Sequence, residues 1–290
     1  MALTVAQAFP ILLERLVPLE SDRKAKADHR TSVEASLKGA VSFNILLFRE
    51  TGSFTHGTGV RGHCDVDLLA SISGSRPGSS DTALGWVKNA LSTTFWNSTV
   101  QIRRPTVVVL FNSGTETWEI LPAFRTSPAT DTPVYDIPGA SSGWMSAAPT
   151  AHLDYVTAVN KKAGLNGGAK KLARLAKAWK YYNGVPVSSF YLEMRAAEYM
   201  DVQTYFDPAT DLCGFLEWLC KIKLAQMNDP AGKASRFSPC SSDATYATAL
   251  SNLNTAATRA RKALNAQIAG NQSDAFGWWN LVFNRRFPAR

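Results

Sequence analysis

Residues 51–72 read TGSFTHGTGVRGHCDVDLLASI, and the two ends of this stretch predict the fold. It begins with a small Gly52-Ser53 loop and ends with Asp65 and Asp67, just before an apolar run. Side chains two apart in a β-strand lie on the same face, so both carboxylates point the same way. They repel each other unless a cation lies between them, and Mg²⁺ prefers such oxygen ligands. Two solvated acids at the start of a strand are the plain alternative.

A second segment, residues 116–124 (ETWEILPAF), supplies a third carboxylate. Strand alternation places Glu119 with Thr117 and Leu121 on one face, opposite Glu116, Trp118 and Ile120. Considered by itself, Glu119 would be an acid on an edge strand. Upstream, a glycine at position 52 lets the backbone approach a phosphate closely, and the next residue adds a hydroxyl donor. The combination favours a phosphate-binding loop beside a group of metal-binding acids.

Gly-Ser, a short spacer and Asp-x-Asp resemble the signature of the DNA-polymerase-β-like nucleotidyltransferases. The segment Glu119-Ile-Leu-Pro-Ala-Phe124 is similar to the third-acid strand of the oligoadenylate-synthase and cyclic-GMP-AMP-synthase branch, where the acid is usually Asp. Here it is Glu, one methylene longer. With the further motifs below, the chain is identified as a member of the bacterial cGAS/DncV-like nucleotidyltransferases (CD-NTases).

The resemblance implies that Asp65, Asp67 and Glu119 hold two Mg²⁺ ions, with Mn²⁺ as a possible substitute. Glu119 or a water would help to deprotonate the attacking hydroxyl, while Gly52 and Ser53 close over the triphosphate. The implied reaction is template-independent transfer of a nucleoside monophosphate from an NTP, such as ATP, to a ribose hydroxyl with release of pyrophosphate. It would build a cyclic di- or trinucleotide second messenger for anti-phage (CBASS) signalling, read by a separate effector protein. Base identity, 2′–5′ or 3′–5′ linkage, ring size and activating signal stay open.

Two segments of the second half carry the remaining motifs. LAKAW, at 175–179, resembles the Leu-Val-Lys-x-Trp helix of oligoadenylate synthase, which implies that Lys177 contacts the triphosphate. VSSFYLE, at 187–193, resembles a segment in which a serine donates to the nucleotide and the next aromatic stacks on the base, which implies Ser189 and Phe190.

Each of these residues also has an ordinary structural interpretation. Lys170, Arg174 and Lys177 would share one solvated helix face. Ser188-Ser189 is a natural helix N-cap, and Phe190 could belong to the core. Arg174 and Lys180 are weaker candidates for phosphate contact.

The periodicity predicts an α+β protein with a cleft between two lobes. The predicted domains are a catalytic nucleotidyltransferase lobe, residues 1–149, and a helical oligoadenylate-synthase-like lobe, residues 150–290. A helix over 4–17 should precede either a long spine helix to about residue 46 or a shorter helix followed by a strand. The expected strands cover 65–73, 100–104, 106–111, 116–121 and 134–138, followed by a linker-like loop at 139–149. The expected later helices cover 150–164, 168–183, 187–202, 209–227, 242–270 and 273–285.

Composition restricts the partners. The 290 residues carry a net charge of +8, with a pI near 9.4, which suits nucleotides, nucleic acid or an anionic membrane. No run approaches the roughly 18–20 apolar residues of a membrane span. The four cysteines include no Cys-x-x-Cys pair, which is typical of reduced cysteines in a cytoplasmic protein. We expect a monomer without a membrane association.

Two other functions share parts of this pattern. A nucleotidyltransferase that modifies a tRNA end or a protein acceptor would have the same three acids. A non-catalytic basic protein that binds nucleic acid, with contact through its basic face, would show salt-dependent binding and no metal-dependent turnover. The presence of three matched acids argues against the second.

Overall fold

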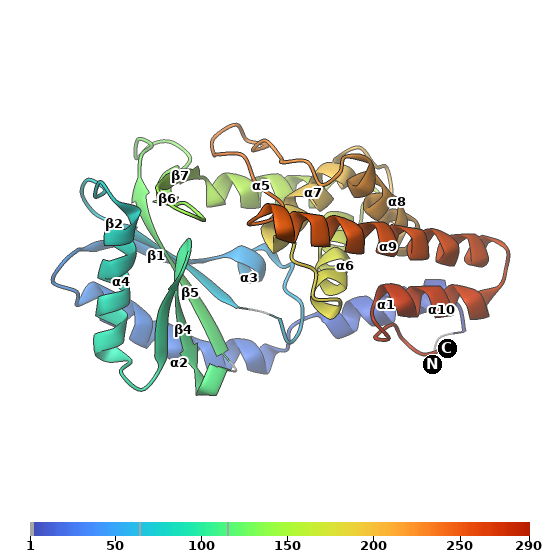
Figure 1. Cartoon of the computed structure of the whole chain (residues 1–290), viewed down its shortest axis with the longest axis horizontal. Coiled ribbons are helices and arrows are strands. Elements are labelled where there is room, and N and C mark those ends of the chain that lie inside the picture. Colours follow the sequence, from blue (N-terminus) through green and yellow to red (C-terminus); the bar gives the residue numbers. More distant parts are fainter. Residues whose placement is uncertain (1–2, 64, 115) are drawn as a thin grey trace.

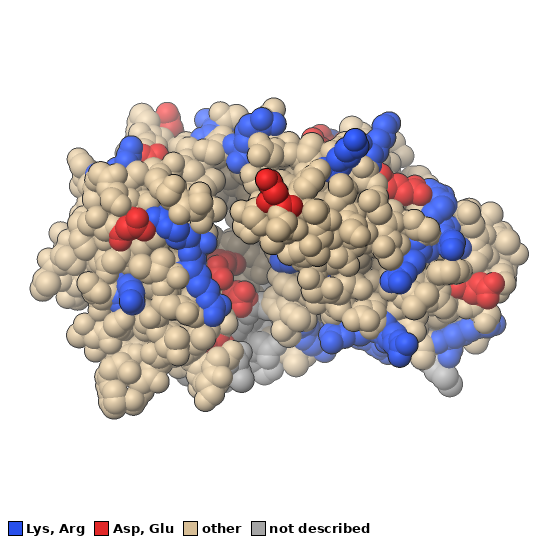
Figure 2. Space-filling model, viewed as in Figure 1, with Lys and Arg blue, Asp and Glu red and all other residues tan. Residues whose placement is uncertain are grey.

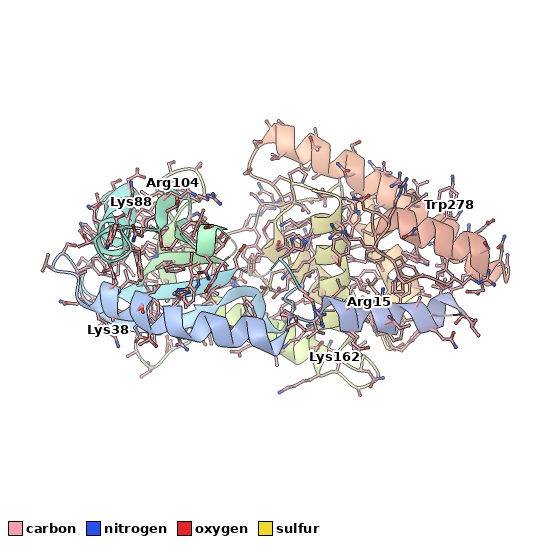
Figure 3. The ribbon with its side chains drawn as sticks, turned by 90° about the horizontal axis from the view of Figure 1, so that it is seen from below. Arg15, Lys38, Lys88, Arg104, Lys162 and Trp278 are labelled. Carbon is pink, nitrogen blue, oxygen red and sulfur yellow. The ribbon has the colours of Figure 1, made fainter. Side chains whose placement is uncertain are left out.

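The computed structural model describes residues 3–63, 65–114 and 116–290; the side chains of residues 20–28 lie outside the description. Figure 1 shows a sheet lobe beside an all-helical lobe, which confirms the predicted α+β architecture. The first two helices are α1 (Val5–Leu16) and α2 (Glu20–Lys38). Figure 3 shows them end to end along the underside, from Arg15 below the helical lobe to Lys38 below the sheet lobe.

The main sheet has the strand order β1-β2-β5-β4-β3. Its strands are β1 (Ile45–Thr51), β2 (Val66–Ile72), β5 (Glu116–Arg125), β4 (Thr106–Phe111) and β3 (Thr99–Arg103). Strands β2 and β5 run parallel, and the other neighbours are antiparallel. Two short strands, β6 (Tyr135–Pro138) and β7 (Trp144–Ala147), extend the sheet from β5. The sheet is therefore mixed, as predicted.

The structure corrects one expectation from the sequence and decides between two alternatives for another. Residues 139–149 are not only a loop, because Trp144–Ala147 pair with β6. Their small and polar residues show no strand alternation, so only the neighbouring strand reveals them. The spine-helix alternative is also decided: α2 ends at Lys38, and the apolar residues that follow enter β1 at Ile45.

The two faces of the sheet have different coverings. Helices α2 and α4 (Ser80–Thr94) pack on one face, where alternate residues of β2, β4 and β5 form a dry core. On the other face, Leu69 and Ala123 lie beneath β6 and β7. The register places Asp67 opposite Glu119 on that second face, nearer the start of β2. Asp67 and Glu119 therefore lie on the sheet face opposite the core formed with α2 and α4.

The helical lobe contains α5 (Pro149–Asn160), α6 (Gly168–Tyr182), α7 (Ser189–Asp201), α8 (Pro208–Lys221), α9 (Asp243–Ile268) and α10 (Gln272–Val282). Helix α1 packs in the same core, where Phe9 lies 5.0 Å from the Trp279 ring. The domain boundary at residue 149 stays a prediction. Helix α1 precedes this boundary in the sequence but packs with the helical lobe. No helix of the described residues is long and apolar enough to span a bilayer. Cys213, Cys220 and Cys240 are free thiols, and Cys64 lies outside the described residues.

Candidate active site

Three carboxylates gather near the start of β2 and β5. Asp67 stands directly opposite Glu119 in the parallel register, so their side chains share one face. The burial of β5 alternates as predicted, with Glu119 partly exposed between the buried Trp118 and Ile120. Asp65 is exposed just before β2 and acts electrostatically on both acids. Figure 2 shows acidic side chains in the recess between the two lobes.

The pKa values of these acids show an excess of negative charge. Burial, Glu119 and Asp65 raise the pKa of Asp67 to about 7, although Lys177 and the Ser53 N–H oppose the shift. Burial and Asp65 also raise the pKa of Glu119, against the Thr106 hydroxyl and more distant cations. A divalent cation would relieve this repulsion, and carboxylate oxygens are the ligands that Mg²⁺ prefers. The donor set therefore fits the metal.

Two of the acids also have hydrogen-bond partners within the protein. Within the described ranges, no three His, Cys, Asp or Glu side chains form a ready metal site. The Asp67 carboxylate accepts the Ser53 N–H, and Glu119 Oε2 lies 3.5 Å from the Thr106 hydroxyl.

Gly52 and Ser53 contact Asp67 directly. They were predicted as a loop, but they begin the short helix α3 (Gly52–His56) at the end of β1. Gly52 has a φ of +66°, and a Cβ at this position would lie 1.9 Å from Asp67 Oδ2. Only glycine fits because both the backbone conformation and the space exclude a side chain. The Gly-Ser segment and the Asp-x-Asp segment therefore form one unit.

The predicted phosphate-binding lysine lies deeper than expected. Lys177 is 2% exposed, and its Nζ donates to Thr58 Oγ1 at 3.2 Å and Glu193 Oε2 at 3.4 Å. The solvated-face alternative does not hold for Lys177. Its role toward phosphate stays a prediction.

A second lysine of α6, Lys180, contacts the predicted Ser189. Its Nζ donates to Ser189 Oγ at 2.6 Å. Burial and Lys177 lower its pKa to about 8, against Asp65 and Glu119, which raise it. Lys180 therefore lies between the acids and the predicted serine. The sequence offered Lys180 only as a weaker candidate for phosphate contact, from the same basic stretch as Lys177.

The two adjacent serines have separate roles. Ser188 caps α7, because its side chain accepts the Tyr191 N–H at 3.3 Å. The hydroxyl of Ser189 is left to bind Lys180 and the Tyr181 hydroxyl, the latter at 3.0 Å. The capping alternative is thus satisfied by the first serine alone.

Phe190 is an exposed aromatic rather than a core residue. Its side chain is 36% exposed, with the ring 5.2 Å from His152 and 4.9 Å from Phe237. His152 is buried, and its Nε2 lies 3.1 Å from Asp229. A supported aromatic face of this kind can stack on a base. The support by His152 was not predicted, because it depends on a loop 77 residues away.

The fold and these residues define a two-lobed nucleotidyltransferase. Residues 3–160, more than half of the chain, match the family model described as "Second Messenger Oligonucleotide or Dinucleotide Synthetase domain" (SMODS). The chain belongs to this family of synthetases. The predicted relationship to the bacterial CD-NTases is confirmed, and with it a function in making oligonucleotide messengers from NTPs. Comparison with curated proteins finds no match.

Solved structures share the whole architecture. The structure of Escherichia coli MS115-1 CdnC with ATP has a TM-score of 0.76 at 18% identity, covering 98% of this chain and 99% of that chain. Vibrio cholerae DncV cyclic AMP-GMP synthase, with the linear intermediate 5′ pppA(3′,5′)pG, has a TM-score of 0.74 at 12% identity, covering 96% and 94%. Bradyrhizobium diazoefficiens CD-NTase CdnG with GTP has a TM-score of 0.68 at 17% identity, covering 96% and 98%. At these identities, the similarity shows the fold.

Proposed function

We propose that this protein joins NTPs into a cyclic di- or trinucleotide, using Asp65, Asp67 and Glu119 as its catalytic acids. The observation that carries the proposal is the pairing of Asp67 with Glu119 beneath Gly52, in a site that raises the pKa of both acids. Such an arrangement is costly for folding alone and is typical of a site that binds cations.

The reaction is an in-line displacement at the α-phosphorus of an NTP. A ribose hydroxyl oxygen of the acceptor forms the new P–O bond, the bond to the β-phosphate oxygen breaks, and pyrophosphate leaves. The proton of the hydroxyl passes to Glu119 or to a water beside it. Two Mg²⁺ ions, or Mn²⁺, held by the three acids would stabilise the charge on the attacking and leaving oxygens.

The phosphates need donors from both lobes. The Ser53 hydroxyl approaches from the sheet lobe, and Lys180 with Ser189 from the helical lobe. Lys177 contributes its charge from behind, because it already acts on Asp67 through space. Phe190 stacks on a base, which tolerates any base identity.

The printed ligands of related structures support this chemistry. CdnC was solved with ATP, and DncV with a linear 5′ pppA(3′,5′)pG intermediate, which is the product of one transfer. A second transfer within such an intermediate would close the ring. We place the product in anti-phage (CBASS) signalling through a separate effector protein, with the enzyme as a cytoplasmic monomer.

Product analysis tests the proposal. The purified protein is incubated with all four NTPs and Mg²⁺ or Mn²⁺, and phosphatase-resistant products are identified by mass spectrometry. We expect a cyclic oligonucleotide without added RNA or protein, and no product from a folded Asp67→Ala variant. Label transfer only to added tRNA or protein would favour the alternative nucleotidyltransferase. Salt-dependent RNA binding without any turnover would favour the non-catalytic alternative.

A further inference from the structure

A buried charged cluster lies between the lobes, separate from the three acids. His56 and Thr58 come from the end of α3 and the following loop, Lys177 from α6, and Glu193 from α7. These residues are 5%, 0%, 2% and 3% exposed, respectively. Ionised side chains are rarely buried to this extent unless they are paired.

Every charge in this cluster has a partner. Glu193 Oε1 contacts His56 Nδ1, and Glu193 Oε2 accepts hydrogen bonds from Thr58 and Lys177. Lys177 also donates to Thr58 Oγ1 at 3.2 Å. Burial alone would raise the pKa of Glu193, but Lys177, His56 and Thr58 hold it at about 2. Glu193 is therefore an ionised carboxylate that joins the two lobes.

A second contact holds the same loop from the same helix. Arg174 of α6 donates to the carbonyl oxygens of Gly57 at 2.6 Å and Gly59 at 3.0 Å. The loop is joined in turn to the phosphate segment, because the Thr58 N–H donates to the Ser53 carbonyl at 3.0 Å. A shift of residues 57–59 would therefore move Ser53, and with it the hydrogen bond to Asp67.

The two helices that supply this cluster also supply the proposed phosphate donors. Lys177 and Lys180 are three residues apart on α6, and Ser189 and Glu193 are four residues apart on α7. Residues at these spacings are neighbours on one helix face. The buried cluster is therefore about one helical turn away from the Lys180–Ser189 pair.

We propose that Glu193 is a positioning residue that, through Thr58 and His56, sets the distance between Ser53 and the Lys180–Ser189 pair. A triphosphate can be gripped from both lobes only when these donors face each other correctly. A displacement of about 1 Å in such a site can reduce the rate by about 10²-fold. The role rests on the nucleotidyl transfer proposed above, because it assumes that a triphosphate binds between the lobes.

Replacement of Glu193 by Gln gives a test with a diagnostic sign. By Coulomb's law, removing a negative charge near an anion site should tighten nucleotide binding. Loss of positioning should instead weaken nucleotide binding. We expect Glu193→Gln to raise the KM for NTP by about tenfold or more, with a smaller change in kcat.

The experiment measures pyrophosphate release from the NTP mixture with Mg²⁺, for wild type and variant, well below the melting temperature of each. Glu198→Gln is the matched control, because it removes an ion-paired carboxylate from the same helix without touching α3. We expect the control to keep the wild-type KM. An unchanged KM in Glu193→Gln would reduce the cluster to a stabilising role and overturn the inference. A lower KM would overturn it too, in favour of a simple charge effect.

Two further measurements distinguish a failure of this inference from a folding defect and from a failure of the proposed function. Thr58→Val retains the side-chain size and removes one link, so it replaces Glu193→Gln if that variant does not fold. We expect a KM increase of a few fold, and an unchanged KM would again overturn the inference. Absence of turnover in the wild-type protein would contradict the proposed function itself, a different result from an active wild type with unaffected variants.

Discussion

Two groups of acidic side chains in this protein differ in how their charge is balanced. Asp67 and Glu119 repel each other on one sheet face, and the pKa of each is raised. Glu193 is buried more completely, yet Lys177 and His56 keep its pKa at about 2. A buried carboxylate of this protein therefore stays ionised where basic side chains of the same chain pair with it. The absence of such balance around Asp67 and Glu119 points to a cation from solution.

We infer that the difference separates an acid that stabilises the fold from the acids proposed above as catalytic. A balanced acid is expected to affect folding when it is removed. An unbalanced acid is expected to affect catalysis, and its removal can even stabilise the protein. The following four predictions test this distinction, beginning with the largest effect.

Neutralising the acid on β5 should abolish turnover. Glu119→Gln keeps the size of the side chain but loses a charge that we propose holds Mg²⁺, so we expect kcat to fall by about 10³-fold or more. The control is Glu116→Gln on the opposite face, where the carboxylate forms hydrogen bonds with His29 and Trp118. That variant should unfold more easily and keep its turnover per folded molecule. Equal losses of activity in both variants would contradict the distinction between balanced and unbalanced acids.

Filling the space beside Asp67 should disturb the unbalanced acids without changing any charge. In Gly52→Ala, the new Cβ would lie 1.9 Å from Asp67 Oδ2, in a backbone conformation that alanine rarely adopts. We expect kcat/KM to fall by about 10²-fold. Gly85→Ala in α4 is the control, because a Cβ there meets nothing within 4 Å. Wild-type kinetics in Gly52→Ala would contradict the observed packing.

Removing one partner of the Lys177–Glu193 pair should destabilise the protein more, per substitution, than removing both partners together. Lys177→Met and Glu193→Gln each leave a buried charge without its main partner, and each should lower the free energy of unfolding by about 3–5 kcal/mol. The double variant should lose clearly less than the sum of the two, as measured by urea denaturation. The exposed pair Lys162–Asp201 is the control, for which we expect a coupling below about 1 kcal/mol. Simple additivity in the buried pair would show that the charges do not interact.

The smallest effect is a pH dependence of the metal-free protein. Because folding raises the pKa of Asp67 from 3.8 to about 7, the folded state binds this proton more tightly than the unfolded state. The resulting stabilisation is complete below pH 4 or so and is lost as the pH rises through about 7. In EDTA, Asp67→Asn should therefore melt higher than wild type by a few degrees at pH 8 and by less at pH 5. A difference that does not change with pH would contradict the raised pKa.

Local spacing predicted much of the sheet lobe. The i, i+2 aspartates, the strand over 106–111 and the face of Glu119 follow from a two-residue period that neighbouring residues enforce. Most helices of the second half likewise begin and end near their predicted bounds, because Gly and Pro breaks and capping residues act locally. The prediction of a helix to residue 227 was wrong: α8 ends at Lys221, and Lys223 and Leu224 have a positive φ that no helix continues. Strand β7 was missed because pairing with β6, rather than its own composition, defines it.

By itself, the sequence determined the two-lobed α+β plan, the sheet face of Glu119 and the family, since these depend on short-range periodicity and motif order. Only the tertiary structure decided that Lys180, and not Lys177, contacts Ser189, and that Glu193 pairs with His56 across 137 residues. Helical spacing shows which residues share a face, but the docking of α3 against α6 and α7 decides what that face meets. Balanced and unbalanced carboxylates look alike in a sequence because their partners come from other parts of the chain.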